Sequence, residues 1–275
     1  MTQQIPFSQK HPLLFAAGMT ALFIGLAMLV GRLLAPFADF ADGSMPCYAV
    51  RIGKRLLVAA VFGWIAWKTR LKPSLFRVRL DGVLLVACLS LVVINLSVPH
   101  LLDARSWLFA GQNLLTTVVV GLDCLMVGIL EELVFRGVVF GALLQAWKQK
   151  RYGKLGAVVV SGVLFGLVHL INLIKNPHAV FEVLEQVGYS TLIGVLLAAA
   201  VLRTGGLVFS VVVHALFNLV FDYAALLPFF PEAVWYGGTA KTIVTVATYV
   251  CLAAAGTLTV VRAVTARDSQ PVRAG

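Results

Sequence analysis

The fold class is decided near the N-terminus, where residues 13–35 read LLFAAGMTALFIGLAMLVGRLLA. Arg32 is the one charged residue in this stretch, which exceeds the roughly 20 apolar residues that cross a hydrocarbon core about 30 Å thick. The stretch is also longer than the apolar region of a secretory signal. We therefore expect a retained membrane anchor.

The rest of the chain continues this pattern. Of its 275 residues, 60% are hydrophobic and only 12% are charged, which is typical of a membrane protein rather than of a soluble core. Candidate spans lie near 13–35, 49–67, 80–99, 113–134, 156–172, 181–202, 206–228 and 240–261. We predict an all-α, polytopic membrane bundle with about eight transmembrane helices, forming one integral membrane domain over residues 1–275.

The basic residues follow the short loops between these spans. A net charge of +10 could indicate nucleic acid, but the cations do not gather on one amphipathic face, so we expect no nucleic-acid partner. With both termini cytoplasmic, most loop cations fall on the inner side; the exception is the cluster Arg51, Lys54 and Arg55. We expect membrane lipids as partners and the inner membrane of a bacterium as the location.

Ionisable residues inside apolar spans are costly and therefore candidates for function. The fourth span carries Asp123, Glu131, Glu132 and Arg136, the fifth carries His169, and the seventh carries His214 and Asn218. Glu132 and Arg136 are spaced i,i+4 and share a helix face, either as a purely structural ion pair or as a pair that holds a site. Glu131 is rotated by about 100° from Glu132, which leaves it free to face another helix. Asp123 is assigned to packing or hydration.

Three helices bring these groups to similar depths. At 1.5 Å per residue, Glu131 lies roughly 25 Å from Lys148, His169 roughly 22 Å from Lys154 and His214 roughly 16 Å from Arg203. Gly162 and Gly166 form a GxxxG spacing that allows the His169 helix to approach a neighbour closely. The polar groups are therefore predicted to meet in one buried cavity.

A carboxylate, two imidazoles and a carboxamide suit the hydrolysis of an amide bond. In a cavity of low dielectric constant, Glu131 can act as the general base that takes a proton from water, and His169 can orient that water. His214 and Asn218 can donate hydrogen bonds to the oxyanion that develops when water attacks a carbonyl. We expect the substrate to be a protein or peptide at or in the membrane.

Other hydrolase designs lack their motifs here. The chain contains no GxSxG, HExxH or GxGD, and its cysteines form no CxxC pair. Glu131, His169 and His214 could still ligate zinc from separate helices, with water completing the tetrahedron. We favour catalysis by glutamate without a cofactor and keep a metalloprotease as the alternative.

Three motifs resemble those of a known family. Glu131-Glu132-x-x-x-Arg136, Phe165-x-x-x-His169 and His214-x-x-x-Asn218 follow one another on consecutive spans and are similar to the motifs of the CPBP family, also called the Abi or CAAX-protease-like family. The similarity extends over residues 110–222, including the turn Arg203-Thr204-Gly205-Gly206.

The resemblance implies an intramembrane endopeptidase with an eight-helix membrane fold and a protease core at 110–222. It assigns Glu131 as the base, which acts together with His169. It assigns His214 and Asn218 as the oxyanion donors, and Glu132 and Arg136 as supporting residues. Prenylated CAAX-type proteins are the substrates best known for this family. Two rivals stay open: a non-proteolytic membrane scaffold or immunity-type protein, and a proton-coupled carrier.

Overall fold

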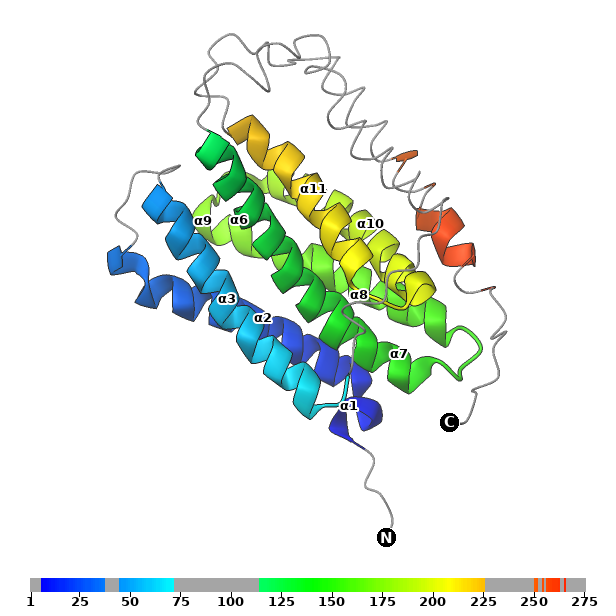
Figure 1. Cartoon of the computed structure of the whole chain (residues 1–275). Helices are drawn as coiled ribbons and strands as arrows, with labels where there is room; N and C mark the ends of the chain where they lie inside the picture. Colours follow the sequence, from blue (N-terminus) through cyan, green and yellow to red (C-terminus); the bar gives the residue numbers. More distant parts are fainter. Residues whose placement is uncertain are drawn as a thin grey trace.

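The computed structural model describes residues 6–37, 45–71 and 114–225, together with 250, 251, 254, 256–262 and 265. All regular secondary structure in these residues is helical, as predicted (Figure 1). Three helices among them are long and apolar enough to cross a membrane: Pro12–Leu33, Gly153–Ile174 and Val180–Thr204. The total of eight crossings stays a prediction, and the predicted spans 80–99 and most of 240–261 lie outside the described residues.

The first helices are α1 (Phe7–Lys10), α2 (Pro12–Leu33), the short 3-10 turn η1 (Ala35–Phe37) and α3 (Met45–Lys68). The second described stretch contains α6 (Leu114–Glu132), η2 (Leu133–Phe140), α7 (Gly141–Trp147), α8 (Gly153–Leu167), η3 (Val168–Ile171), α9 (Asn172–Lys175), α10 (Val180–Thr204) and α11 (Val208–Ala225). These bounds agree closely with the predicted spans at 13–35, 49–67, 181–202 and 206–228.

The fourth span is longer than predicted. We expected it to end near residue 134, whereas α6, η2 and α7 follow one another without a break to Trp147. Arg136 does not end the span, because its charge is paired within the same helix by Glu132. The middle section η2 is a π-helix, in which each N–H bonds to the carbonyl five residues earlier; such segments are rare and frequently lie at functional sites.

The helices pack around this long element. In Figure 1, α6 lies between α3 and α11, and the π-helical segment η2 contacts α2, α3 and α8. Helix α8 packs along α10, and α10 also contacts α11. The helices that carry the predicted polar motifs, α6, α8 and α11, are thereby joined through η2 and α10.

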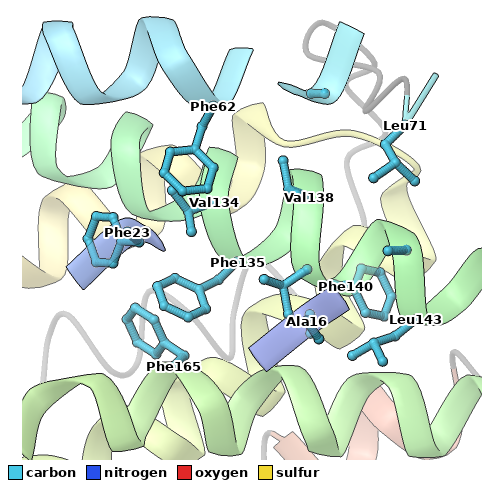
Figure 2. Packing of buried hydrophobic residues seen from close by; sticks show 14 of the residues in the cluster. Ala16, Phe23, Phe62, Leu71, Val134, Phe135, Val138, Phe140, Leu143 and Phe165 are labelled. Atoms are coloured by element: carbon cyan, nitrogen blue, oxygen red, sulfur yellow. The ribbon is translucent and has the colours of Figure 1, made fainter. Parts of the chain in front are cut away.

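Aromatic side chains fill the centre of the bundle. Phe135 of η2 lies between Phe23 of α2, with ring centroids 5.7 Å apart, and Phe165 of α8, at 5.1 Å; both pairs are edge-to-face (Figure 2). Phe62 of α3 joins the row by its contact with Phe23 at 6.2 Å. Such edge-to-face pairs add to the stabilisation from burial alone. The row ends at Phe165, next to the candidate site.

The turn between α10 and α11 requires glycine. Gly205 has φ of 74°, in the left-handed region, and ends α10. The hydroxyl of Thr204 donates to the Ala200 carbonyl at 2.9 Å and accepts from the Gly206 N–H at 3.4 Å. The chain therefore reverses within a few residues, which brings α11 and His214 back into the bundle.

Apolar side chains also cover the outside of the bundle. Leu14, Leu29, Leu33, Leu56 and Trp67 are all more than half exposed, as expected for a surface that faces lipid. At the end of α3, the Lys68 ammonium lies 4.8 Å from the ring centroid of Trp67, and this combination of a cation and an aromatic ring is typical of a membrane interface. The chain is an integral membrane protein.

Helices α8 and α10 cross at glycines, as the GxxxG spacing predicts. A Cβ atom added to Gly162 would lie 2.7 Å from the backbone nitrogen of Val195 and 3.1 Å from the carbonyl carbon of Gly194. Real Cβ atoms essentially never approach backbone so closely, so α10 would have to move away. This crossing holds the Gly194 carbonyl in place as a hydrogen-bond acceptor for Arg136.

We expect Gly162→Ala to lower the free energy of unfolding by about 1–3 kcal/mol, because overpacking forces two helices apart. Gly63→Ala in α3 is the matched control, because a Cβ there meets nothing within 4 Å. In the control, the better helix propensity of alanine should raise stability by up to about 1 kcal/mol. Thermal unfolding in detergent compares the two, and equal stability of both variants would contradict the close crossing.

Candidate functional site

The paired glutamates of the first motif lie where α6 ends and the π-helix begins. Glu132 is the last residue of α6, and Arg136 lies in η2. The Glu132 side chain is fully buried, whereas that of Glu131 is 20% exposed. Two neighbouring carboxylates therefore have different surroundings, as the predicted rotation of about 100° between them requires.

Glu132 forms a buried ion pair with Arg136. The Arg136 Nη1 to Glu132 Oε1 distance is 2.9 Å, and neither side chain is exposed, which confirms the predicted i,i+4 pair. Arg136 also donates from Nη2 to the Gly194 carbonyl at 3.3 Å, and its guanidinium lies 4.3 Å from the centroid of the Phe165 ring. The pair is thus anchored to both α8 and α10, and it fixes how η2 sits against them.

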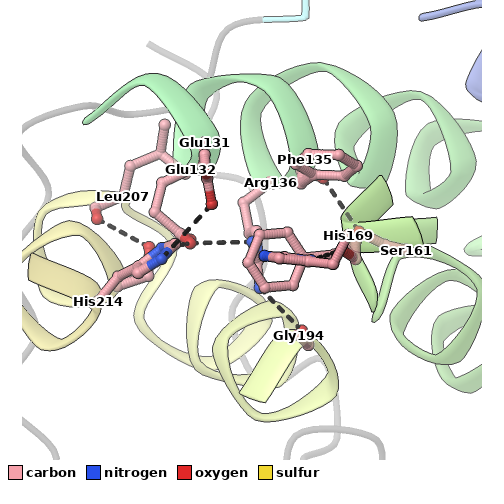
Figure 3. Close-up of polar contacts among 11 residues, drawn as sticks. Glu131, Glu132, Phe135, Arg136, Ser161, His169, Gly194, Leu207 and His214 are labelled. Atoms are coloured by element: carbon pink, nitrogen blue, oxygen red, sulfur yellow. Dashed lines mark hydrogen bonds and ion pairs between the residues drawn. The ribbon is translucent and has the colours of Figure 1, made fainter. Parts of the chain in front are cut away.

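His214 of α11 contacts both glutamates from the facing helix (Figure 3). Its Nδ1 is 2.9 Å from Glu132 Oε1, and its Nε2 is 3.6 Å from Glu131 Oε2. An ionised carboxylate only accepts hydrogen bonds, so Nδ1 carries a proton and donates a hydrogen bond to Glu132. This contact fixes the orientation of the imidazole and directs Nε2 toward Glu131.

His169 joins the site through Phe165. It lies in the 3-10 turn η3 that follows α8, and its Nδ1 donates to the Phe165 carbonyl at 3.0 Å. The Phe165 ring packs edge-on against both imidazoles, with centroids 5.4 Å from His169 and 5.6 Å from His214. His169 makes no hydrogen bond to Glu131 within the part of the chain that the structure describes. Its Nε2 is the ring atom left available to water or substrate.

Asn218 lies one turn after His214 on α11 and is partly exposed. Their i,i+4 spacing places both side chains on one side of the helix. Within the described residues, no hydrogen bond engages the Asn218 carboxamide, so its N–H donors are available. The structure therefore brings Glu131, Glu132, Arg136 and His214 into direct contact and leaves His169 and Asn218 beside them.

Two supporting contacts were not predicted. The Ser161 hydroxyl of α8 donates to the Phe135 carbonyl of η2 at 3.0 Å, in a fully buried position (Figure 3). A π-helix interrupts the regular i→i+4 ladder, so an outside donor for one of its carbonyls stabilises it. The second supporting contact is the hydrogen bond that the Gly194 carbonyl accepts from Arg136. The sequence signal that could have indicated the role of Ser161 is its position as a small polar residue next to the GxxxG spacing.

Asp123 was assigned to packing or hydration, but the structure pairs it with α3. It is almost completely buried and forms ion pairs with Arg51 and Arg55. These contacts explain why cations are tolerated near the start of an otherwise apolar helix, because a carboxylate on the neighbouring helix compensates them.

The described residues do not form a zinc site. No group of three His, Cys, Asp or Glu side chains among them lies close enough to hold a metal ion, and Glu131, His169 and His214 are no exception. His214 Nδ1 is engaged by Glu132, and His169 Nδ1 by the Phe165 carbonyl. A zinc ion needs three protein ligands that converge on one point. The geometry of these residues does not fit a zinc ion.

Residues 113–220 match a protein-family model described as type II CAAX prenyl endopeptidase Rce1-like. The matched segment begins one residue before α6 and ends within α11, so it includes all three motifs. No curated protein and no solved structure matches the chain. The resemblance to CAAX-type proteases is thus confirmed over this segment, and it implies a membrane protease that acts on protein.

Proposed function

We propose that this chain, whose residues 113–220 match the Rce1-like type II CAAX prenyl endopeptidase family, is an intramembrane endopeptidase in which Glu131 activates water. One observation carries the proposal. Of two adjacent glutamates, Glu132 is buried in an ion pair with Arg136, whereas Glu131 is partly exposed and faces the imidazole of His214. Only Glu131 is accessible to a water molecule.

Glu131 acts as a general base. Its carboxylate takes a proton from water, and the hydroxide oxygen attacks the carbonyl carbon of the scissile peptide bond. The carbonyl oxygen becomes an oxyanion in a tetrahedral intermediate. When the intermediate collapses, the C–N bond breaks and the protonated Glu131 delivers its proton to the leaving nitrogen. His169 can assist by accepting a hydrogen bond from the same water at Nε2, since its Nδ1 is committed to the Phe165 carbonyl.

The oxyanion requires donors, and α11 provides them. Glu132 holds the His214 ring through Nδ1, and this contact directs Nε2 toward Glu131. When Nε2 carries a proton, it can donate a hydrogen bond to the oxyanion. The Asn218 carboxamide, one turn away, supplies a second donor. Hydrogen bonds that are already oriented before the charge develops stabilise the transition state more than the ground state.

Glu132 and Arg136 act as positioning residues. Glu132 orients His214 through Nδ1, in the way that a buried carboxylate orients a catalytic histidine. Arg136 compensates the Glu132 charge and ties it to α10 through the Gly194 carbonyl. The four residues form one connected set across α6, η2, α10 and α11.

The proposed substrates are membrane-associated proteins, including prenylated CAAX-type proteins, cut near the C-terminus. The proposed location is the inner membrane of a bacterium, with both termini cytoplasmic and residues 1–275 forming one domain. The observation behind the proposed orientation is the charge pattern: Lys148, Lys150, Arg151 and Lys154 follow each other between α7 and the first turn of α8. A loop of this kind is typical of the cytoplasmic side.

Cleavage by the purified, detergent-solubilised protein tests the function. The probes are a quenched, prenylated CAAX-type peptide and a mixed set of membrane-protein C-termini, each with and without a chelator. We expect cleavage that is unaffected by chelator, because Glu131, His169 and His214 do not converge on one point where a metal could bind. Loss of activity with chelator and its recovery with zinc would identify a metalloprotease, whereas no cleavage of any probe would contradict the proposal.

Asn218→Ala should lower kcat by about 10²- to 10³-fold and change KM little, because one oxyanion donor is removed. Folding should be unaffected, since no hydrogen bond of the described residues engages the carboxamide. The measurement is steady-state cleavage of the best peptide found above. An increase in KM at constant kcat would instead indicate that Asn218 binds substrate without stabilising the oxyanion.

A further inference from the structure

A pair of carboxamide side chains lies beyond His169, outside the three motifs. Asn172 begins α9, and its Nδ2 donates to Oε1 of Gln186, in the second turn of α10, at 2.8 Å. Both residues lie within helices that are long and apolar enough to cross a membrane, Gly153–Ile174 and Val180–Thr204. The hydrogen bond ties these helices together, but it does not use all the polar groups of the pair.

The pair retains one acceptor and one donor. A carboxamide has an oxygen that accepts hydrogen bonds and an NH2 group that donates them, so Asn172 Oδ1 and Gln186 Nε2 are still available. No other hydrogen bond engages either side chain within the described residues, and both side chains are partly exposed. One residue of an extended peptide presents the complementary groups, an N–H and a C=O, on the same edge of the strand.

The pair lies on the same side of the chain as His169. Asn172 directly follows the 3-10 turn η3 and continues its backbone conformation, with φ of −65° and ψ of −21°. Side chains three residues apart in a 3-10 helix eclipse each other, so His169 and Asn172 point the same way. At about 2.0 Å per residue they are about 6 Å apart along the axis. An extended peptide covers this distance in about two residues.

A substrate that is cleaved at membrane depth needs such partners. A helix must open at the bond that Glu131 attacks, and the peptide groups next to that bond then lose their helical hydrogen bonds. Hydrocarbon offers no replacement, so an unsatisfied backbone group is far more unfavourable there than in water. Side chains of the enzyme that accept and donate beside the site would stabilise the opened peptide.

We propose that Asn172 and Gln186 bind the backbone of one extended substrate residue, about two residues from the scissile bond. Asn172 Oδ1 accepts a hydrogen bond from the N–H of that residue, and Gln186 Nε2 donates one to its C=O. The inference rests on the proposed function, since it places the scissile bond beside His169. Because only backbone groups are bound, this contact is the same for every substrate side chain at that position.

The first test alters the substrate and leaves the protein unchanged. In a set of peptides with one scissile bond, the amide N–H at successive positions on either side of that bond is replaced by an ester oxygen. We expect the ester about two residues away to lower kcat/KM about two- to tenfold, as for one lost hydrogen bond. Equal cleavage of all these peptides overturns the inference, but cleavage that still depends on Glu131 leaves the proposed protease function intact.

The second test assigns the effect to Asn172. Asn172→Leu should cleave the amide and that ester equally, because the acceptor is gone, whereas Asn172→Asp keeps an oxygen and should retain the preference for the amide. Gln145→Leu, at an exposed position of α7, is the control and should keep the full preference. If Asn172→Leu lowers cleavage of amide and ester by the same factor, Asn172 only ties α9 to α10 and the inference is wrong.

The third test concerns the donor and does not depend on the folding of the Asn172 variants. Gln186→Met removes the donor and should raise KM about two- to tenfold with little change in kcat. A contact that is equally strong in the ground state and the transition state contributes to binding alone. A fall in kcat at unchanged KM would overturn the assignment of Gln186 to substrate binding.

Discussion

Glu131→Gln is expected to lower kcat/KM for peptide cleavage by about 10²- to 10⁴-fold, the usual contribution of a general base. The carboxamide has almost the shape of the carboxylate but cannot take a proton from water. Because the Glu131 side chain is 20% exposed and lies as far as 3.6 Å from His214 Nε2, the fold should tolerate the change, with a free energy of unfolding within about 1 kcal/mol of the original.

The control for this prediction is Glu182→Gln, at an exposed position in the first turn of α10. It removes the same charge from the same chain and should leave cleavage and stability unchanged. Both variants are compared with the original protein by cleavage of one peptide and by thermal unfolding in detergent. A Glu131→Gln protein that cleaves at the original rate would exclude Glu131 as the base. A variant that no longer cleaves but keeps full biological activity would favour a non-proteolytic scaffold role.

Glu132→Leu is expected to produce the largest loss of stability, about 3–5 kcal/mol. It removes the carboxylate that compensates Arg136, whose side chain is fully buried, and it leaves His214 Nδ1 without its acceptor. A buried charge without a partner is far more unfavourable than either a complete pair or an apolar replacement. Thermal unfolding in detergent measures the loss.

The double variant Glu132→Leu/Arg136→Met separates stability from function. Replacing both members of the pair by apolar residues of similar size should recover most of the lost stability, because no charge is left uncompensated. Cleavage should stay low, since His214 is still without the carboxylate that orients it. If the double variant is no more stable than Glu132→Leu, the pair does not contribute as argued; if it regains full activity, Glu132 does not position His214.

Much of this architecture could be predicted because it depends on local spacing. Four apolar stretches gave helix bounds within a few residues of α2, α3, α10 and α11, since the bilayer requires long helices and allows little else. The Glu132–Arg136 pair followed from the i,i+4 rule alone. The spacing of Gly162 and Gly166 similarly predicted that α8 crosses a neighbouring helix closely, and that neighbour is α10.

Contacts between helices could not be predicted in this way. The sequence did not indicate that His214 would lie next to Glu131 or that the Phe165 carbonyl would hold His169 Nδ1. The rotation of each helix about its own axis decides such contacts, and that rotation results from packing of the whole bundle. The same reason explains why Asp123 was not paired with α3 beforehand.

Apolar length, helical period and residue order are local properties, so they are enough to predict a helical membrane protein with three polar motifs similar to those of CAAX-type proteases. Which of the two glutamates is accessible depends instead on tertiary packing. That packing buries Glu132 against Arg136 and His214 and leaves Glu131 partly exposed at the start of a π-helix that Ser161 supports. These outcomes depend on helices that are far apart in the sequence and approach each other only when the bundle is assembled.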